Sequence, residues 1–298
     1  MNSRPDYELI DFGNGRKLEA IHGYLLNRPS PAALSAHPQH SDRWPKADAI
    51  FDEVNRKWAF RTPWPSEAYI EGPGFRLPVQ PTPFGHIGVF PEQRPHWRWL
   101  SGVVRSLKES THVDNVAGES MPSAPLSLNL FAHTGGSTLA LAAAGSSVVH
   151  VDAAKPNVVA AKEAARISGL GDAAIRYMVD DAAKFTAREV RRNRKYDVIV
   201  MDPPAYGHAP GGKAWRLDRD LWPLIDDALE LMNVTQGAML ITGHSEGIDQ
   251  ETVADYLRRH KTLLRFGKQR DISLGRSSLH DQQGRGLDAG YYVRVHWL

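Results

Sequence analysis

Short apolar segments and helix-forming segments alternate strictly between residues 126 and 260 of this 298-residue chain, and no other feature limits its fold as strongly. Each apolar segment has the length of a strand covered on both faces, and each gap has room for a crossover helix. Strands are predicted near residues 126–131, 147–151, 175–179, 196–201 and 237–242, with helices near 137–144, 155–168, 182–193, 218–233 and 249–260. The sheet should therefore be largely parallel and doubly wound.

Two more strand-like segments follow, near residues 263–274 and 290–297. Only a loop containing Gly and Arg separates them, so no helix returns the chain and one of the two should run antiparallel. The fold class predicted for this region is α/β: a Rossmann-like, doubly wound, mostly parallel seven-stranded sheet with a terminal antiparallel strand.

Residues 1–92 have a different character. They are rich in proline and tryptophan, and residues 7–12 read as a strand that ends in the turn Gly13-Asn14-Gly15. The aromatic residues need a core, and some of them could stack on bases. We expect a small β-rich N-terminal lobe over residues 1–92 with a role in substrate recognition, and a catalytic domain over residues 93–298 that opens with a helix near Pro95.

Composition excludes several kinds of site. The chain has no cysteine, so it has no disulfide, thiolate metal site or thiol nucleophile. Its histidines lack metal-ligand spacing, and no metal is predicted. No apolar run approaches the ~20 residues that span a bilayer, and the first residues lack a signal-peptide core. A cytoplasmic protein without a membrane partner is expected.

The end of the fourth predicted strand carries an unusual group of residues. The apolar run 198–201 is followed by Asp202, Pro203, Pro204, Ala205 and Tyr206. The prolines cannot donate to a strand ladder, so pairing should stop at Asp202. Ligands of open α/β sheets bind beyond the carboxyl ends of the strands. An acceptor, a rigid turn and an aromatic ring at that place suit a flat ring that bears N–H groups. A Pro-rich turn with a solvated aspartate is the alternative.

Polar residues also follow the first three strands. The first runs into the turn Ala132-His133-Thr134-Gly135-Gly136, where glycine lets backbone approach a ligand closely. The second ends in Asp152, which is placed to accept both hydroxyls of a ribose or, alternatively, to cap a helix. The third ends in Asp180 and Asp181, where a carboxylate could accept an adenine amino group or serve as an N-cap.

Four segments together resemble the class I S-adenosylmethionine-dependent methyltransferases, and within them the ribosomal RNA large subunit methyltransferase I and K group. They are residues 128–136 (LNLFAHTGG), 151–155 (VDAAK), 179–182 (VDDA) and 202–206 (DPPAY), and the resemblance covers roughly residues 84–298. It implies S-adenosyl-L-methionine as cofactor, bound by Asn129, Phe131, His133, Thr134, Gly135, Asp152, Ala153, Lys155, Asp181, Ala182 and Asp202. It also implies catalytic roles for Asp202, Pro203, Pro204 and Tyr206.

The chain departs from that group in two places. The tyrosine of the group's first motif is His133 here, which changes any ring contact at that position. The RNA-binding PUA domain of some members is not expected in the residues before 84.

The residues favour methylation of nitrogen. Methylation of carbon 5 of cytosine requires a thiolate, and the chain has no cysteine. A nitrogen acceptor needs no covalent step: Asp202 and the Pro203 carbonyl can accept from an amino group and orient it. Whether Tyr206 stacks on the ring or only lines the pocket stays open. His208 and residues 213–216 are further candidates for substrate contact.

The leading hypothesis is therefore an enzyme that N-methylates a base in RNA, with ribosomal RNA as its source. A net charge of +2 does not argue for RNA by itself, and the basic segment 188–195 could be a solvated helix end or a phosphate contact. A small molecule or a protein side chain is the alternative acceptor. An NAD-dependent oxidoreductase, which should show GxGxxG, and a catalytically silent cofactor- or RNA-binding module are more distant alternatives. The oligomeric state stays open.

Overall fold

A computed structural model describes residues 5–113, 124–207, 214–245, 247–266 and 270–297. The chain forms two compact units. Unit 1 consists of residues 1–71, 76–94 and 277–289, and unit 2 of residues 72–75, 95–276 and 290–298. The assignment of separate domains to residues 1–92 and 93–298 stays a prediction. The compact units do not follow a single cut in the chain, because residues 277–289 belong to unit 1.

Unit 2 is built on a seven-stranded sheet of order β10-β9-β8-β11-β14-β16-β15. Neighbouring strands from β10 to β14 are parallel, and β16 runs antiparallel to β14. The strands are β8 (Leu126–Leu130), β9 (Ser147–Asp152), β10 (Ile175–Val179), β11 (Val198–Met201), β14 (Gly237–Gly243), β15 (Arg270–His280) and β16 (Gly286–Trp297). This arrangement confirms the predicted fold class.

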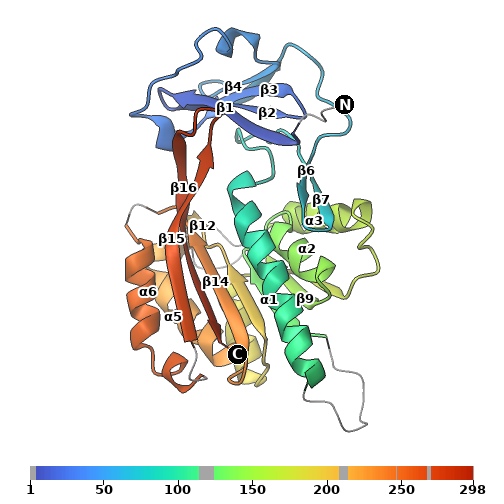
Figure 1. Cartoon of the computed structure of the whole chain (residues 1–298), viewed down its shortest axis with the longest axis vertical. Helices are drawn as coiled ribbons and strands as arrows, with labels where there is room; N and C mark the ends of the chain where they lie inside the picture. The colour runs from blue at the N-terminus through green and yellow to red at the C-terminus, as the bar shows by residue number, and fades with distance from the viewer. Residues whose placement is uncertain (1–4, 114–123, 208–213, 246, 267–269, 298) are drawn as a thin grey trace. The chain divides into compact units, whose positions relative to one another are not determined.

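Helices cover both faces of this sheet, as the alternating pattern predicts. They are α1 (Arg94–Val113), α2 (Gly136–Ala143), α3 (Lys155–Ile167), α4 (Ala182–Arg191), α5 (Leu217–Leu231) and α6 (Gln250–Arg259). Residues 199 and 201 of β11 pack in a cluster with α4, α5 and α6, whereas residues 198 and 200 pack with α1 and α2. Figure 1 shows α5 and α6 on one side of the sheet and α1 on the other.

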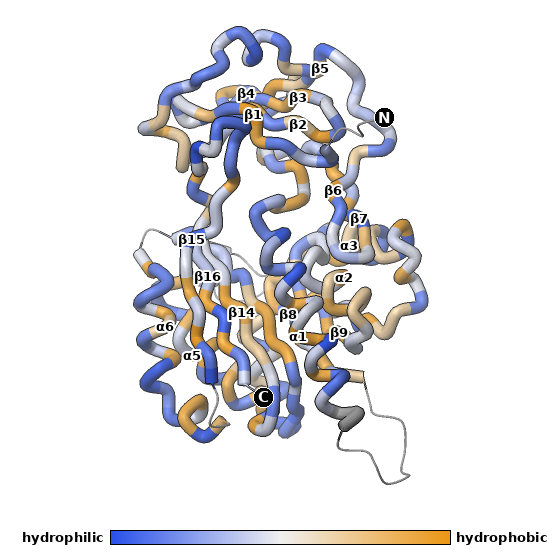
Figure 2. Tube along the Cα trace, viewed as in Figure 1, coloured by the Kyte–Doolittle hydropathy of each residue, from blue (hydrophilic) through white to orange (hydrophobic). Residues whose placement is uncertain are grey.

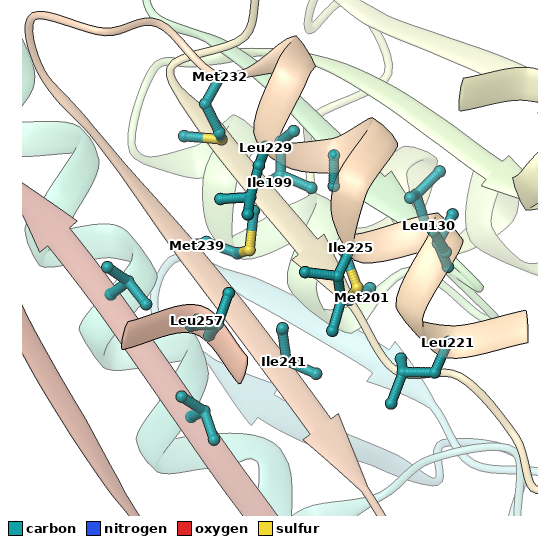
Figure 3. Close-up of a cluster of buried hydrophobic side chains, with 14 of the residues drawn as sticks. Leu130, Ile199, Met201, Leu221, Ile225, Leu229, Met232, Met239, Ile241 and Leu257 are labelled. Atoms are coloured by element: carbon teal, nitrogen blue, oxygen red, sulfur yellow. The ribbon is translucent and has the colours of Figure 1, made fainter. Parts of the chain in front are cut away.

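The apolar character of the strands follows from burial on both faces. All seven residues of β14 are buried. Figure 2 shows β14 as mostly hydrophobic, whereas α6 is mostly hydrophilic. Leu221, Ile225 and Leu229 recur on one face of α5 and pack against strand residues such as Met201 (Figure 3). Each fully buried aliphatic side chain of this kind contributes roughly 1.5–3 kcal/mol. This packing holds the strand ends in fixed positions.

One predicted strand lies elsewhere than expected. Residues 263–265 form a short 3-10 helix, and β15 begins at Arg270, so the prediction of a strand from 263 is wrong at its start. Leu263 and Phe266 are buried in the core cluster that contains α5 and α6. This stretch is therefore apolar like a buried strand, although it forms a 3-10 helix. The partner strand β16 starts at Gly286, four residues earlier than predicted.

Unit 1 contains the predicted β-rich lobe. Its five-stranded sheet has the order β1-β2-β3-β4-β5, and β6 and β7 form a separate two-stranded ladder. The strands are β1 (Tyr7–Gly13), β2 (Arg16–Ile21), β3 (Tyr24–Pro29), β4 (Ala49–Asp52), β5 (Lys57–Phe60), β6 (Tyr69–Gly72) and β7 (Phe75–Pro78). Residues of the ladder β6–β7 are divided between the two units.

Buried charges hold unit 1 together. Glu19 is fully buried and accepts from Arg28, Tyr7 and Lys17. Asp11, also fully buried, accepts from the Trp44 indole at 2.8 Å and from the Arg285 guanidinium, 274 residues away. The Asp11–Arg285 contact ties residues 277–289 to the N-terminal sheet.

Candidate active site

The reversal of strand order places a crevice between β8 and β11. From β8 the chain moves outward to β9 and β10, and it then returns to add β11 and β14 on the other side of β8. Because β8 and β11 are parallel neighbours, with Leu130 opposite Met201, their carboxyl ends lie side by side. This is the switch point at which open α/β sheets bind ligands. The residues that follow β8 and β11 therefore lie at this point.

The turn after β8 has an unusual backbone. Phe131 and His133 have φ of 52° and 48°, and Gly135 has φ of 93°. Left-handed φ at a non-glycine residue costs roughly 1–3 kcal/mol and persists only where the surroundings impose it. A Cβ on Gly135 would lie 3.0 Å from the Ala161 Cβ, so glycine is also needed for close packing on α3. The turn is held in one conformation before any ligand arrives.

Two histidines beneath and within this turn are neutral. Burial lowers the pKa of His133, although the nearby carboxylates of Asp152 and Asp202 oppose the change. His133 therefore interacts electrostatically with two of the three strand-end acids. Burial likewise lowers the pKa of His150 to about 4.

Asn129 lies below the turn and takes part in a buried chain of hydrogen bonds. Its amide donates to the Thr138 hydroxyl at 2.9 Å, and that hydroxyl lies 2.9 Å from His150 Nδ1. If the hydroxyl donates to Nδ1, the proton of His150 is on Nε2, a buried atom without a partner among the described residues. Asn129 is predicted to bind cofactor, and its side chain in this structure braces α2 against β8.

Asp152 ends β9 and is buried. One oxygen accepts from the His133 backbone at 2.8 Å, and the other accepts from the Ala154 backbone at 2.9 Å and the Asn157 amide at 3.1 Å. These bonds lock the carboxylate between the turn after β8 and the start of α3. A carboxylate has about four acceptor positions, so one remains for a further donor such as a hydroxyl. Ala153 is half-buried beside it, and Lys155 is exposed at the first position of α3.

Asp181 follows β10 and caps α4. Its side chain accepts from the Lys184 backbone at 2.9 Å, which is the N-cap alternative considered above. The preceding Asp180 pairs with Arg188, and Ala182 is buried in the core beneath. Asp181 and Trp215 also line a cavity of about 220 Å³. That volume is below the 300–1,000 Å³, roughly, of pockets for drug-sized ligands, so it can take only part of such a ligand.

Asp202 follows β11 directly and is half-buried, with Pro203 buried behind it. The Pro204 carbonyl accepts from the Trp215 indole at 2.7 Å, and the Trp215 ring lies against Phe131, with centroids 5.0 Å apart. Trp215 thus links the turn after β11 to the turn after β8. Nothing in the sequence indicates this role of Trp215 except its position in a loop close to residues 202–206.

The Tyr206 ring is open to solvent. It is 74% exposed, and its backbone lies in β12 (Tyr206–Gly207), which pairs with β13 (Trp215–Arg216). The sequence alternatives for this ring were a stacking surface and a pocket wall, and both stay predictions. His208 and Lys213 lie outside the described residues.

Tyr291 is a polar group at this edge that the sequence reasoning missed. It pairs with Gly243 at the end of β14, two residues beyond the Ile241 that pairs with Met201 of β11. A Cβ on Gly243 would lie 2.7 Å from the Tyr291 hydroxyl, so only glycine leaves room for the ring across the strand end. The hydroxyl is buried and has no hydrogen-bond partner in the described part of the chain. Burial, and then the charges of Asp202 and Asp249, raise its pKa to about 12, so the phenol stays protonated.

The basic segment 188–195 behaves as a helix end. Arg188 pairs with Asp180, Arg192 pairs with Glu189 at 3.0 Å, and the Lys195 ammonium donates to the Glu230 carbonyl at 2.6 Å. These local partners agree with the solvated-helix alternative.

The described residues lack a metal-binding cluster and a membrane-spanning helix. They contain no group of three or more His, Asp or Glu side chains arranged to hold a metal ion. They also contain no helix long and apolar enough to cross a membrane.

Curated proteins resemble part of the chain, whereas no family model matches it. One of them comes from Photobacterium profundum and is named ribosomal RNA large subunit methyltransferase I. It is 30% identical over 159 residues, or 49% of this chain and 39% of that protein. The chain thus matches about two fifths of that relative's length.

Solved structures match nearly the whole chain. The crystal structure of the SAM-dependent methyltransferase from Agrobacterium tumefaciens has 31% identity and a TM-score of 0.83, covering 99% of this chain and 91% of its own. A methyltransferase complexed with SAH shares the fold, with a TM-score of 0.69 at 17% identity, covering 99% of this chain and 76% of its own.

The strand order and the switch point are those of a Rossmann-like class I transferase fold, and acids lie at the ends of three of its strands. The chain belongs to the S-adenosylmethionine-dependent methyltransferases and is related to the ribosomal RNA large subunit methyltransferase I group. It is an enzyme, and its cofactor is S-adenosyl-L-methionine.

The described residues fit that cofactor. Asp152 is fixed by three donors and retains acceptor capacity, as a ribose requires. The strained turn at residues 131–135 brings backbone to the switch point. The individual cofactor contacts stay proposals, since they rest on placement at the strand ends.

Proposed function

We propose that this enzyme methylates a nitrogen atom of a base in RNA, with ribosomal RNA as the source of the substrate. The observation that carries the proposal is the position of Asp202-Pro203 at the end of β11, beside the turn after β8. Asp202 also interacts electrostatically with His133 of that turn. The curated relative is named for a ribosomal RNA activity. The absence of cysteine from the 298 residues favours nitrogen over carbon 5 of cytosine as acceptor.

The bound cofactor supplies an activated methyl group, so the protein mainly has to align the acceptor. In the proposed mechanism the Asp202 carboxylate and the Pro203 carbonyl accept from the amino group of the base. This contact fixes the direction in which the nitrogen lone pair points. The Pro204 carbonyl is already engaged by Trp215, which keeps the turn rigid.

The Tyr291 hydroxyl completes the proposed acceptor site. It is a protonated donor beside the charge of Asp202, so it can donate to a ring nitrogen or carbonyl oxygen of the same base. The donor lies on β16 beside the end of β14, and the acceptor follows the neighbouring strand β11. Together they match the edge of a base that carries an amino group next to an acceptor. The exposed Tyr206 ring is proposed to stack on the face of that base.

Cofactor contacts are proposed for the other end of the site. Asp152 accepts a ribose hydroxyl, Asp181 accepts the adenine amino group, and Ala153 and Ala182 provide the small surfaces beside them. The backbone of Phe131, His133, Thr134 and Gly135 lines the amino-acid part, with Lys155 at the rim.

Comparison of modified nucleosides in total RNA from wild-type and deletion cells tests this proposal. One N-methylated nucleoside should disappear from ribosomal RNA in the deletion strain and return with the wild-type gene but not with Asp202→Ala. If no methylated nucleoside disappears, the RNA acceptor is wrong, and a small molecule or a protein side chain becomes the acceptor to seek.

A further inference from the structure

Unit 1 carries a hollow whose lining residues all belong to that unit. It has a volume of about 690 Å³ and is built by the edge strand β5 together with residues 64–68 and 78–83. Edge strands usually carry charges or are covered, because their unpaired backbone invites association. This edge carries Lys57 but also exposes an aromatic side chain, which calls for an explanation.

Two aromatic rings form one wall of the hollow. Trp58 and Phe60 are two residues apart on β5 and so point to the same face. Their rings are stacked, with planes 23° apart and centroids 6.3 Å apart. The Trp58 indole donates to the Thr82 carbonyl at 2.8 Å, and its ring meets Phe51 edge-on at 5.3 Å. Trp58 is thus held rigidly, whereas Phe60 is 48% exposed.

Cations form the rim of the hollow. Arg56 and Lys57 line it, and no carboxylate is among the described residues that line it. The Arg56 guanidinium lies 5.7 Å above the ring of Phe84, which is itself 67% exposed.

The acidic residues near β5 are occupied elsewhere. Asp52 accepts from the backbone of Val54 and Asn55 in its own turn, and Glu53 pairs with Arg16 at 2.9 Å. Asp48 accepts from the Leu25 backbone at 2.8 Å. Asp52 lies opposite Lys57 in the β4–β5 ladder, but among the described residues neither Lys57 nor Arg56 forms an ion pair with these carboxylates.

We propose that this basic aromatic face, defined as Arg56, Lys57, Trp58, Phe60 and Phe84, binds single-stranded RNA. Bases would stack on the exposed rings and phosphates would pair with the two cations, which is how sequence-tolerant single-strand sites are built. The proposal rests on the proposed function, since it gives the RNA substrate a second point of attachment. An apolar peptide would not account for the two cations and the absence of acid.

Fluorescence anisotropy of a labelled single-stranded oligouridine of about 12 nucleotides, a length in the range that such sites cover, tests this surface on the full chain. Phe60→Ala should weaken binding about tenfold, the effect typical of losing one stacked base. Lys57→Glu should weaken binding. It should also reduce the slope of log affinity against log salt concentration by about one, as expected for one lost phosphate contact. Leu34→Ala and Lys46→Glu are matched controls, since both side chains are exposed and neither lines the hollow. Neither control should change affinity or salt dependence.

The surface proposal fails if the wild type does not bind the oligonucleotide, or if Phe60→Ala and Lys57→Glu bind like the wild type. It also fails if an oligoproline peptide binds through Phe60 while the oligonucleotide does not. The outcome is separate from that of the nucleoside comparison. Oligonucleotide binding that depends on Phe60, in an enzyme whose deletion removes no RNA methylation, would sustain the surface and refute the proposed acceptor.

Discussion

The two halves of the strand-end site in unit 2 differ in how their polar groups are satisfied. At β8 and β9 the protein supplies its own partners, so that Asp152 accepts three hydrogen bonds and the turn after β8 is fixed. At β11 and β14 the Tyr291 hydroxyl is buried without a partner among the described residues, and the Tyr206 ring faces solvent. A buried, unsatisfied hydroxyl costs roughly 1–3 kcal/mol. We infer that the first half is built before ligand binding and that the second half is completed by the ligand.

The largest effect should follow removal of the acceptor carboxylate. Asp202→Ala should reduce turnover by roughly a hundredfold to a thousandfold, the loss typical of one key polar contact in a transition state. Affinity for S-adenosylhomocysteine should stay within a few-fold, since Asp202 belongs to the acceptor half. Single-turnover methylation and isothermal titration measure the two quantities. Asp202→Asn is the control and should keep a large part of the activity, because its amide oxygen still accepts. Equal loss of affinity and turnover in Asp202→Ala would remove the distinction between the halves.

Asp152→Ala should act on the cofactor half. Cofactor binding should weaken by about 1–3 kcal/mol, because a ribose hydroxyl and the backbone donors of the turn lose their acceptor. Isothermal titration with S-adenosylhomocysteine measures this. Asn157→Ala removes one of the three donors to Asp152 and should cost less. A larger loss in Asn157→Ala than in Asp152→Ala would argue against a role for the carboxylate itself.

Acid should destabilise the folded protein through its buried neutral histidines. Burial lowers the pKa of His96 to about 3 and that of His150 to about 4. Below pH 6.5 these residues are protonated in the unfolded chain but not in the folded one, so unfolding takes up protons and stability falls. Each histidine contributes about 1.4 kcal/mol per pH unit. For His150 the loss runs from about pH 6.5 to 4.

Denaturant unfolding from about pH 7.5 down to about pH 4.5, which spans most of that range, measures this slope. His150→Asn keeps an acceptor for Thr138 and should remove its share of the pH dependence. An unchanged slope in that variant would mean that His150 does not titrate as its burial implies.

Tyr291→Phe should have the smallest effect and the one most specific to the acceptor half. The loss of one neutral hydrogen bond, about 1 kcal/mol, should raise KM for the acceptor a few-fold and leave cofactor affinity unchanged. Because the hydroxyl has no partner in the described residues, its removal should not lower the melting temperature. A marked drop in melting temperature would show that the hydroxyl is structural.

The sequence predicts the first half of the site better than the second. Asp152 and Asp181 can be located because each follows an apolar run whose end is visible in the sequence, and in the second half only Asp202 is located in this way. The brace formed by Asn129 was not foreseen, since it depends on which residue of α2 faces β8. Tyr291 was missed because its position depends on the register between β14 and β16, a long-range pairing without a local pattern.

The same reason explains what the sequence could not show of unit 1. The Arg285 guanidinium contacts Asp11 although the two residues are 274 positions apart in the sequence. No change in composition near either residue indicates that contact. Short-range patterns predicted the β-rich lobe but not the segment from the other end of the chain that completes it.

A crystal structure of the full chain with S-adenosylhomocysteine tests the division into two halves most directly. The division predicts a ribose hydroxyl on Asp152 and the adenine beside Asp181 and Ala182, with the sulfur atom facing Asp202 and the Tyr291 hydroxyl still without a partner. A product bound with its sulfur turned away from Asp202, or with Tyr291 as a cofactor ligand, would contradict it.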